Sequence, residues 1–130
     1  DAQLAAGRDV DLTPDVAADG VDEWLTRIAA STAGTTDPAP APAQDLRGDG
    51  QSLHVHATDP GLSGTGEWLI TRTPSGVTVA RGHGKADVAV RGPAVGLLLV
   101  LTRRLPPSAP GIEVLGEHAL LTHWLEHTPF

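Results

Sequence analysis

The sequence predicts an α+β fold, a mostly antiparallel sheet of about five strands with helices packed on one face. Apolar residues recur at helical spacing near both ends of the chain. Four segments between residues 51 and 92 alternate apolar and polar residues, as half-buried strands do. Turn-forming sequences separate these strands, which favours antiparallel pairing, and 130 residues suffice for one domain around a single core.

The first predicted element is a helix over residues 13–31. Its opening sequence, TPD, supplies an N-cap hydroxyl, a proline at the first helical position and an acid near the positive end of the helix dipole. Gly20 lies inside this helix and indicates either close packing or a break. Residues 32–50 are rich in Pro and Ala and lack periodicity, so we expect an extended, solvated linker.

Four strands are predicted in succession after the linker. The first begins at Ser52, where every second residue is apolar, and the others cover 66–73, 76–83 and 85–92. The sequences TPSG at 73–76 and GHGK at 82–85 predict tight turns. We therefore expect three successive hairpin-type connections.

A second helix should begin after Gly92 and Pro93 and end at Arg103 and Arg104. Its segment GLLLVL is apolar on nearly every side, so we expect it to be the most buried element. A short strand at 111–116 and a final helix at 117–127 follow. Residues 51–130 then form a sheet-and-helix core, which together with the helix at 13–31 makes one domain.

Composition excludes several classes of partner and site. The chain carries 9 Lys and Arg against 16 Asp and Glu, a net charge of -7, and no basic run, which disfavours nucleic acid and membrane surfaces. The longest apolar run, PAVGLLLVL, is too short to cross about 30 Å of hydrocarbon, and we expect a cytoplasmic protein. Without cysteine, any metal site needs His and carboxylate ligands. A chain that lacks methionine and opens on Asp1 is expected to be part of something longer.

The final helix contains HWLEH at 123–127, which matches the H-x-x-E-H pattern of one class of zinc peptidases. His123 and His127, four residues apart, can hold a zinc ion, but the sequence offers no third ligand or enclosed cleft. The alternative is a solvated helix face or a contact surface. The opposite arc, which must face the core, contains Leu120, Leu121, Trp124 and Leu125.

The first strand contains HVH at 54–56, a second weak metal candidate. His54 and His56 share one sheet face and can chelate one ion, although a polar outer strand face is the simpler explanation. His83 and His118 have no partner that the sequence can place. No Ser-His-Asp order, phosphate-binding loop or dinucleotide fingerprint occurs.

Arginines end several of the predicted elements. They are Arg72, Arg81 and Arg91 on strands and Arg103 and Arg104 at the end of the second helix. Several guanidinium groups could converge at one rim and bind carboxylates bidentately. The alternative is ordinary solubilising charge.

Five segments of the chain resemble one known family. They are DVAADGVDEWL (15–25), LHVHATD (53–59), GEWLI (66–70), ADVAVRGPAVGLLLVLTRRL (86–105) and IEVLGEHALLTHWL (112–125). In this order they resemble the C-terminal half of the mycothiol-dependent maleylpyruvate isomerase family of actinobacteria. The resemblance implies a sterol carrier protein-like α/β domain that follows a DinB-like helical bundle. Residues 1–12 resemble the stub of the last helix of that bundle.

The resemblance also implies a role. The bundle of the parent protein would bind a divalent metal, zinc, through two His and a Glu that this chain lacks, and mycothiol would be its thiol cofactor. The chain itself would hold no cofactor and be inactive alone. As an accessory domain it would complete or cover the active site, with Arg91, Arg103 and Arg104 as candidate contacts to a small anionic substrate.

The alternative is a sterol carrier-like module that binds a small apolar ligand between the sheet and the GLLLVL helix. One Phe, three Trp and no Tyr leave few aromatic residues to line such a cavity.

Overall fold

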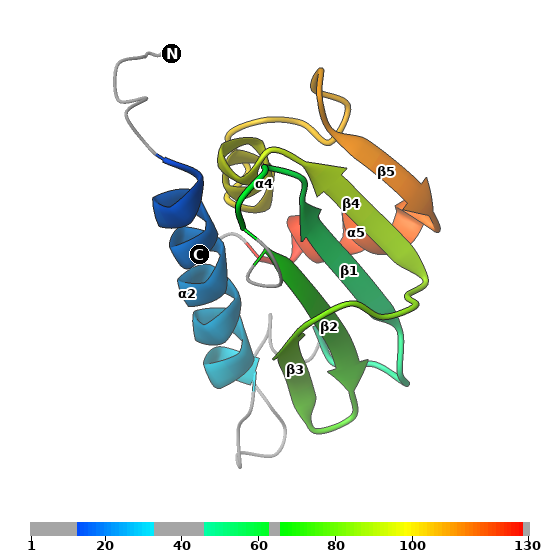
Figure 1. The fold of residues 1–130 in the computed structure, drawn as a ribbon. Helices are drawn as coiled ribbons and strands as arrows, with labels where there is room; N and C mark the ends of the chain where they lie inside the picture. Colours follow the sequence, from blue (N-terminus) through cyan, green and yellow to red (C-terminus); the bar gives the residue numbers. More distant parts are fainter. Residues whose placement is uncertain (1–12, 33–45, 63–65, 129–130) are drawn as a thin grey trace.

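A computed structural model of the chain describes residues 13–32, 46–62 and 66–128, which form three helices and five strands. The elements in order are α2 (Pro14–Thr32), β1 (Ser52–Ala57), β2 (Glu67–Thr73), β3 (Gly76–Arg81), β4 (Val88–Gly92), α4 (Ala94–Leu101), β5 (Glu113–Gly116) and α5 (His118–Glu126). Figure 1 shows the strands side by side in one twisted sheet, with α5 behind it. The predicted α+β fold is confirmed.

The five strands lie in the order β3-β2-β1-β4-β5. Three neighbouring pairs are antiparallel, and β1 and β4 are parallel, so the sheet is mixed but mostly antiparallel, as predicted. The third predicted hairpin is wrong, because β4 pairs with β1 and not with β3. This position beside the central strand leaves Val88 and Val90 of β4 at most 1% exposed.

The segment that joins β3 to β4 crosses β2 and β1 on the side of the sheet opposite the helices. Figure 1 shows it passing in front of the strands. A Cβ atom added to Gly84 would lie 3.0 Å from the side chain of Leu69 in β2, so the backbone packs closely there. At the end of the segment, the Asp87 carboxylate accepts a hydrogen bond of 2.9 Å from the backbone N–H of Ser52.

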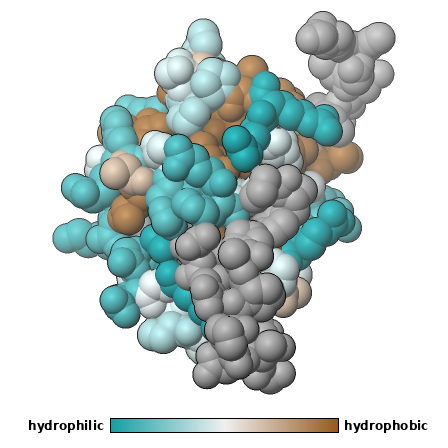
Figure 2. All heavy atoms as spheres, turned by 180° about the vertical axis from the view of Figure 1, so that it is seen from behind, coloured by the Kyte–Doolittle hydropathy of each residue, from teal (hydrophilic) through white to brown (hydrophobic). Residues whose placement is uncertain are grey.

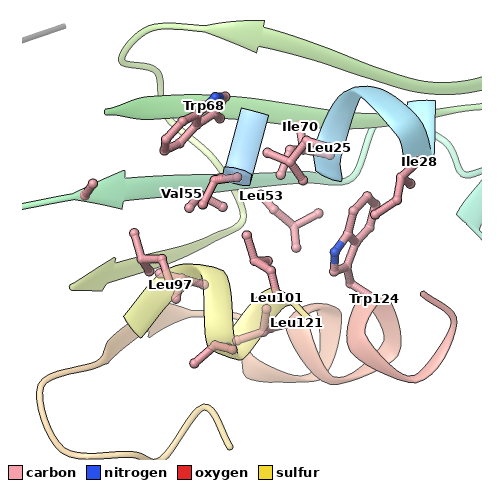
Figure 3. Close-up of a cluster of buried hydrophobic side chains, with 14 of the residues drawn as sticks. Leu25, Ile28, Leu53, Val55, Trp68, Ile70, Leu97, Leu101, Leu121 and Trp124 are labelled. Atoms are coloured by element: carbon pink, nitrogen blue, oxygen red, sulfur yellow. The ribbon is translucent and has the colours of Figure 1, made fainter. Parts of the chain in front are cut away.

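The core fills the space between the sheet and the three helices (Figure 3). Its largest side chains, each at most 2% exposed, include Trp68, Ile70, Leu53 and Val55 from the strands and Leu25, Ile28, Leu97, Leu101, Leu121 and Trp124 from the helices. No residue of α4 is exposed, whereas α2 and α5 each have an exposed face, so the second predicted helix is the most buried of the three.

The N-terminal helix begins and packs as its sequence predicts. The Thr13 hydroxyl accepts a hydrogen bond from the backbone N–H of Val16 at 3.3 Å, as an N-cap does. A Cβ atom on Gly20 would lie 3.1 Å from Leu98 of α4, so this glycine marks close packing and not a break.

The prediction of a solvated linker over 32–50 is wrong at Thr32 and Leu46, although Asp49 and Gly50 at its end are exposed. Residues 1–12 and 33–45 lie outside the described residues, but Thr32 and Leu46 are completely buried. The Arg47 guanidinium donates hydrogen bonds to the carbonyl oxygen of Thr32 at 3.0 and 3.3 Å. Leu46 is a single apolar residue among polar neighbours, so the sequence has no apolar periodicity there from which its burial could be predicted. Among the described residues, no helix is both long and apolar enough to cross a membrane.

Candidate functional site

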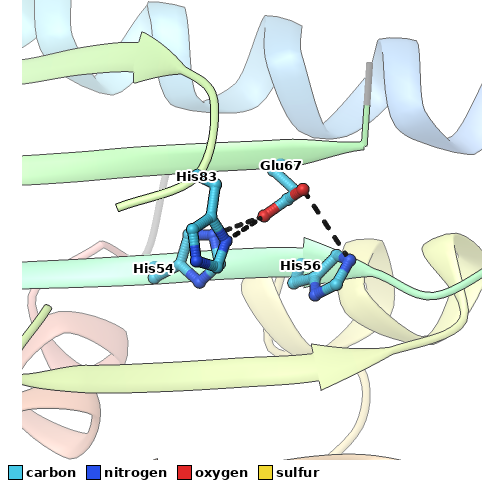
Figure 4. Close-up of polar contacts among 4 residues, drawn as sticks. All are labelled: His54, His56, Glu67 and His83. Carbon is cyan, nitrogen blue, oxygen red and sulfur yellow. Dashed lines mark hydrogen bonds and ion pairs between the residues drawn. The ribbon is translucent and has the colours of Figure 1, made fainter. Parts of the chain in front are cut away.

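Four polar side chains gather on the side of the sheet opposite the helices, which we call the open face. His54 and His56 come from β1, Glu67 from β2, and His83 from the segment after β3. Figure 4 shows the three imidazole rings arranged around the Glu67 carboxylate, with the helices behind the sheet. We call these four residues the histidine cluster.

Glu67 is the common partner of the three histidines. Its Oε1 atom lies 3.0 Å from Nε2 of His54 and 2.9 Å from Nδ1 of His83. Its Oε2 atom lies 4.0 Å from Nε2 of His56. The rings of His54 and His83 meet edge to face, with their centroids 5.2 Å apart. Both oxygens of one carboxylate are therefore directed at imidazole nitrogens.

Strand register explains how β1 and β2 build this cluster. His56 lies directly opposite Glu67 in the antiparallel pair, and His54 is two residues away on the same face. The prediction that His54 and His56 share a sheet face is confirmed. Glu67 was not among the predicted site residues, and His83 had no predicted partner, because it reaches the cluster through the β3–β4 crossover.

Burial and hydrogen bonding shift the pKa values of two members of the cluster. His54 is 6% exposed, and removal from water lowers its pKa although the hydrogen bond and the charge of Glu67 oppose this. The hydrogen bond from His83 is the largest influence that holds the pKa of Glu67 below its usual value. The environment therefore favours a neutral imidazole at His54 beside a charged carboxylate.

A polar hollow of about 310 Å³ lies beside the cluster, at the carboxyl ends of β1 and β4. Its lining includes His56, Asp59, Glu67 and Arg91. The Arg91 Nη1 atom lies 3.5 Å from a carboxylate oxygen of Glu113, and its buried Nε atom has no hydrogen-bond partner among the described residues. The hollow therefore presents one guanidinium and one imidazole, from Arg91 and His56, together with the carboxylates of Asp59 and Glu67.

The predicted convergence of arginines at one rim is wrong. Arg72 and Arg81 point to the helix side of the sheet, where Arg72 is 8% exposed and Arg81 Nε contacts a carboxylate oxygen of Asp22 at 3.1 Å. Arg103 and Arg104 line a separate hollow of about 410 Å³ between the end of α4 and α5. Alternate residues of a strand point to opposite faces, so arginines at strand ends need not meet. Whether Arg91, Arg103 or Arg104 contacts a substrate stays a prediction.

The molecule seen from the side of α5 has a mixed surface. Figure 2 shows hydrophobic and hydrophilic residues interspersed over the coloured part of this side. Leu121, Trp124 and Leu125 of α5 are buried as predicted, Leu120 is partly buried, and Glu126 is exposed.

His123 and His127 are half-buried and do not form the solvated face that the sequence predicts. Nη2 of Arg72 lies 3.4 Å from Nε2 of His123, and Nδ1 of His127 lies 2.8 Å from the His123 carbonyl oxygen. A guanidinium beside His123 opposes the binding of a metal cation there. Within the described residues, one group of three or more potential ligands has its atoms within 4.8 Å of one another, and its members are His54, Glu67 and His83.

Comparison with known proteins identifies the family. The model of the MDMPI C-terminal domain matches residues 15–123, which include every helix and strand up to most of α5. The chain belongs to the MDMPI C-terminal domain family. The resemblance seen in the sequence is thereby confirmed. No curated protein matches the chain significantly.

Solved structures show which fold the MDMPI C-terminal domain shares. A UbiJ-SCP2 ubiquinone synthesis protein is 17% identical with a TM-score of 0.57, covering 88% of this chain and 90% of that chain. Sterol carrier protein domain 2 of Helicoverpa armigera is 15% identical with a TM-score of 0.52, covering 85% and 88%. A stereoselective inverting sec-alkylsulfatase from Pseudomonas sp. is 18% identical with a TM-score of 0.59, covering 98% of this chain but only 18% of the sulfatase. These similarities establish a sterol carrier protein-like fold.

Proposed function

We propose that this chain is the C-terminal accessory domain of a maleylpyruvate isomerase-like protein that depends on mycothiol and a metal. It would complete or cover the active site of an N-terminal DinB-like bundle. The protein would act in the cytoplasm of an actinobacterium. Membership of the MDMPI C-terminal domain family makes this chain an accessory domain. The observation that supports a contribution to an active site is the polar hollow on the open face, which Arg91 lines while it also pairs with Glu113 at 3.5 Å. The catalytic zinc ion and mycothiol would be held by the bundle.

Activity measurements on separate and joined domains test this proposal. We expect this chain alone to show no turnover of maleylpyruvate with mycothiol. The parent bundle alone should turn over slowly, and joining it to this chain should raise the rate, because the substrate then gains contacts that the bundle lacks. Turnover by this chain alone, or a bundle that is fully active without it, would contradict the proposal.

A second candidate is a sterol carrier-like module that binds a small apolar ligand. The hollow between the end of α4 and α5 favours it, because Val100, Leu105 and Leu125 line an apolar part and Arg103 and Arg104 lie beside it. An apolar body with a carboxylate would suit such a site. Native mass spectrometry of the purified chain distinguishes the candidates. A co-purifying apolar ligand that is lost in Leu105→Asp, a change at a more exposed residue of the same hollow, supports the module, and a bare chain opposes it.

A further inference from the structure

We propose that His54, Glu67 and His83 form a zinc-binding site on the open face of this domain, with His56 as a neighbouring fourth donor. The site would be separate from any metal of the DinB-like bundle, because all of its ligands belong to this chain. It goes beyond the proposed accessory role.

The ligand set suits zinc. Two imidazoles and one carboxylate are a known set for zinc sites that keep a coordination position open for water or a substrate. Among the described residues, these three form the one group of at least three His, Cys, Asp or Glu side chains whose ligand atoms all lie within 4.8 Å of one another. Calcium and magnesium prefer oxygen ligands, so an imidazole-rich set favours zinc over these ions.

The present distances are close to those that a metal requires. Tetrahedral zinc with bonds of about 2.0 to 2.1 Å holds its ligand atoms roughly 3.3 Å apart. The two nitrogens of His54 and His83 lie 3.0 and 2.9 Å from the same carboxylate oxygen. Small outward movements of the side chains would admit the ion, and each imidazole would exchange its N–H hydrogen bond for a metal bond.

The surrounding structure holds two ligands rigidly and leaves one adaptable. His54 and Glu67 lie on the paired strands β1 and β2, and the His54 side chain is 7% exposed against 20% for Glu67. His83 is 79% exposed and follows β3 on the crossover segment, whose far end is anchored through Asp87 to Ser52. Rigid ligands lower the entropic cost of binding, and the exposed one gives the ion a path to the site.

The charges around the cluster also favour a cation. The Glu67 carboxylate lies 3.0 Å from His54, 2.9 Å from His83 and 4.0 Å from His56 and supplies a negative charge at the centre of the cluster. Arg91, the cation that lines the neighbouring hollow, lies 3.5 Å from Glu113 and is thereby partly neutralised. By contrast, His123 has a guanidinium as its direct neighbour.

Titration of the chelator-treated full chain with Zn²⁺ and with Co²⁺ tests the proposal. We expect one ion per chain, proton release on binding, and a visible absorption spectrum of bound Co²⁺ typical of four-coordinate geometry. His83→Gln should weaken binding at least tenfold, since even outer partners of metal ligands contribute about 10- to 100-fold. This variant alters an exposed loop residue, so the fold should survive, as circular dichroism would verify.

Two matched variants separate this site from other histidines. His118→Gln removes an exposed histidine outside the cluster, and the double variant His123→Gln/His127→Gln removes the pair on α5. Both should bind Zn²⁺ as the unaltered chain does. Failure to bind stoichiometric Zn²⁺, or binding that survives His83→Gln and disappears in the α5 double variant, would overturn the proposal. Because the bundle is absent, the result does not depend on the isomerase assay.

Discussion

Arg72 of β2 carries a buried positive charge that connects three parts of the chain. Its Nε atom donates to the carbonyl oxygen of Leu46 at 3.0 Å, and its Nη2 atom donates to that of Arg47 at 3.1 Å. Nη2 also lies 3.4 Å from His123 of α5. Burial lowers the pKa of Arg72, but a guanidinium remains charged in proteins. These contacts compensate for the removal of the charge from water.

We expect Arg72→Met to lower the free energy of unfolding by about 1 to 3 kcal/mol, because it leaves buried carbonyl oxygens without a donor. Urea denaturation followed by circular dichroism would measure this loss. The control is Arg81→Met, which removes a half-exposed ion pair with Asp22 and should cost less than about 1 kcal/mol. Equal effects of the two substitutions would show that Arg72 has no special structural role.

The histidine cluster shows which site residues a sequence can predict. The alternation of residues in β1 suffices to place His54 and His56 on one face. Glu67 could also have been found, because an antiparallel register between β1 and β2 brings it opposite His56. His83 could not, since its position depends on where the segment after β3 runs, and local sequence does not determine that path.

At the scale of elements, α2 and α4 approach closely where Gly20 faces Leu98. A Cβ atom at this position would lie 3.1 Å from one methyl carbon of Leu98 and 3.4 Å from the other. Glycine inside a helix costs up to about 1 kcal/mol relative to alanine. The tight helix contact gives a physical reason for this glycine.

Gly20→Val should therefore lower the free energy of unfolding by about 1 to 3 kcal/mol, because a branched side chain would force the two helices apart. Gly20→Ala is the matched variant, and its change should be smaller, since the gain in helix propensity offsets the tight contact. Thermal denaturation of both variants measures the difference. A Gly20→Val protein as stable as the original would mean that Leu98 moves aside freely.

The connection between β3 and β4 shows why strand order was predicted only in part. TPSG joins β2 to β3 as a hairpin, as its sequence predicts. GHGK has similar turn-forming residues, but the chain there crosses two strands to reach the other side of β1. Glycine permits a turn without specifying whether the next strand pairs with the previous one. Burial of Val88 and Val90 beside β1, a long-range effect, decides the outcome.

At the scale of the whole molecule, Leu46 ties the end of the Pro/Ala-rich segment to the core. It is completely buried in the cluster that includes side chains of all three helices and four strands. Leu46→Ala should lower the free energy of unfolding by about 2 to 5 kcal/mol, as loss of a buried leucine does. Leu105→Ala, at a residue that is 36% exposed, is the control and should cost much less. Equal midpoints of urea denaturation for the two variants would contradict this role of Leu46.

The positions of the candidate arginines give a final prediction about the proposed accessory function. Arg91 lies beside the hollow on the open face, whereas Arg103 and Arg104 line a hollow on the helix side. A small substrate cannot contact both hollows at once. On the proposed function, Arg91→Ala should lower kcat/KM of the isomerase-like protein on the order of 100-fold, as the loss of one group that stabilises negative charge does.

Arg103→Ala and Arg104→Ala should leave kcat/KM within a few-fold of the unaltered enzyme. The free energy of unfolding of all three variants should lie within about 1 kcal/mol of that of the unaltered protein. The reason is that Arg91 forms only a half-exposed ion pair and the other two side chains are exposed. Steady-state kinetics with urea denaturation separates a loss of substrate contact from a loss of folded protein. If the Arg103 or Arg104 variant loses activity while Arg91→Ala keeps it, the substrate faces the hollow between α4 and α5 and not the open face.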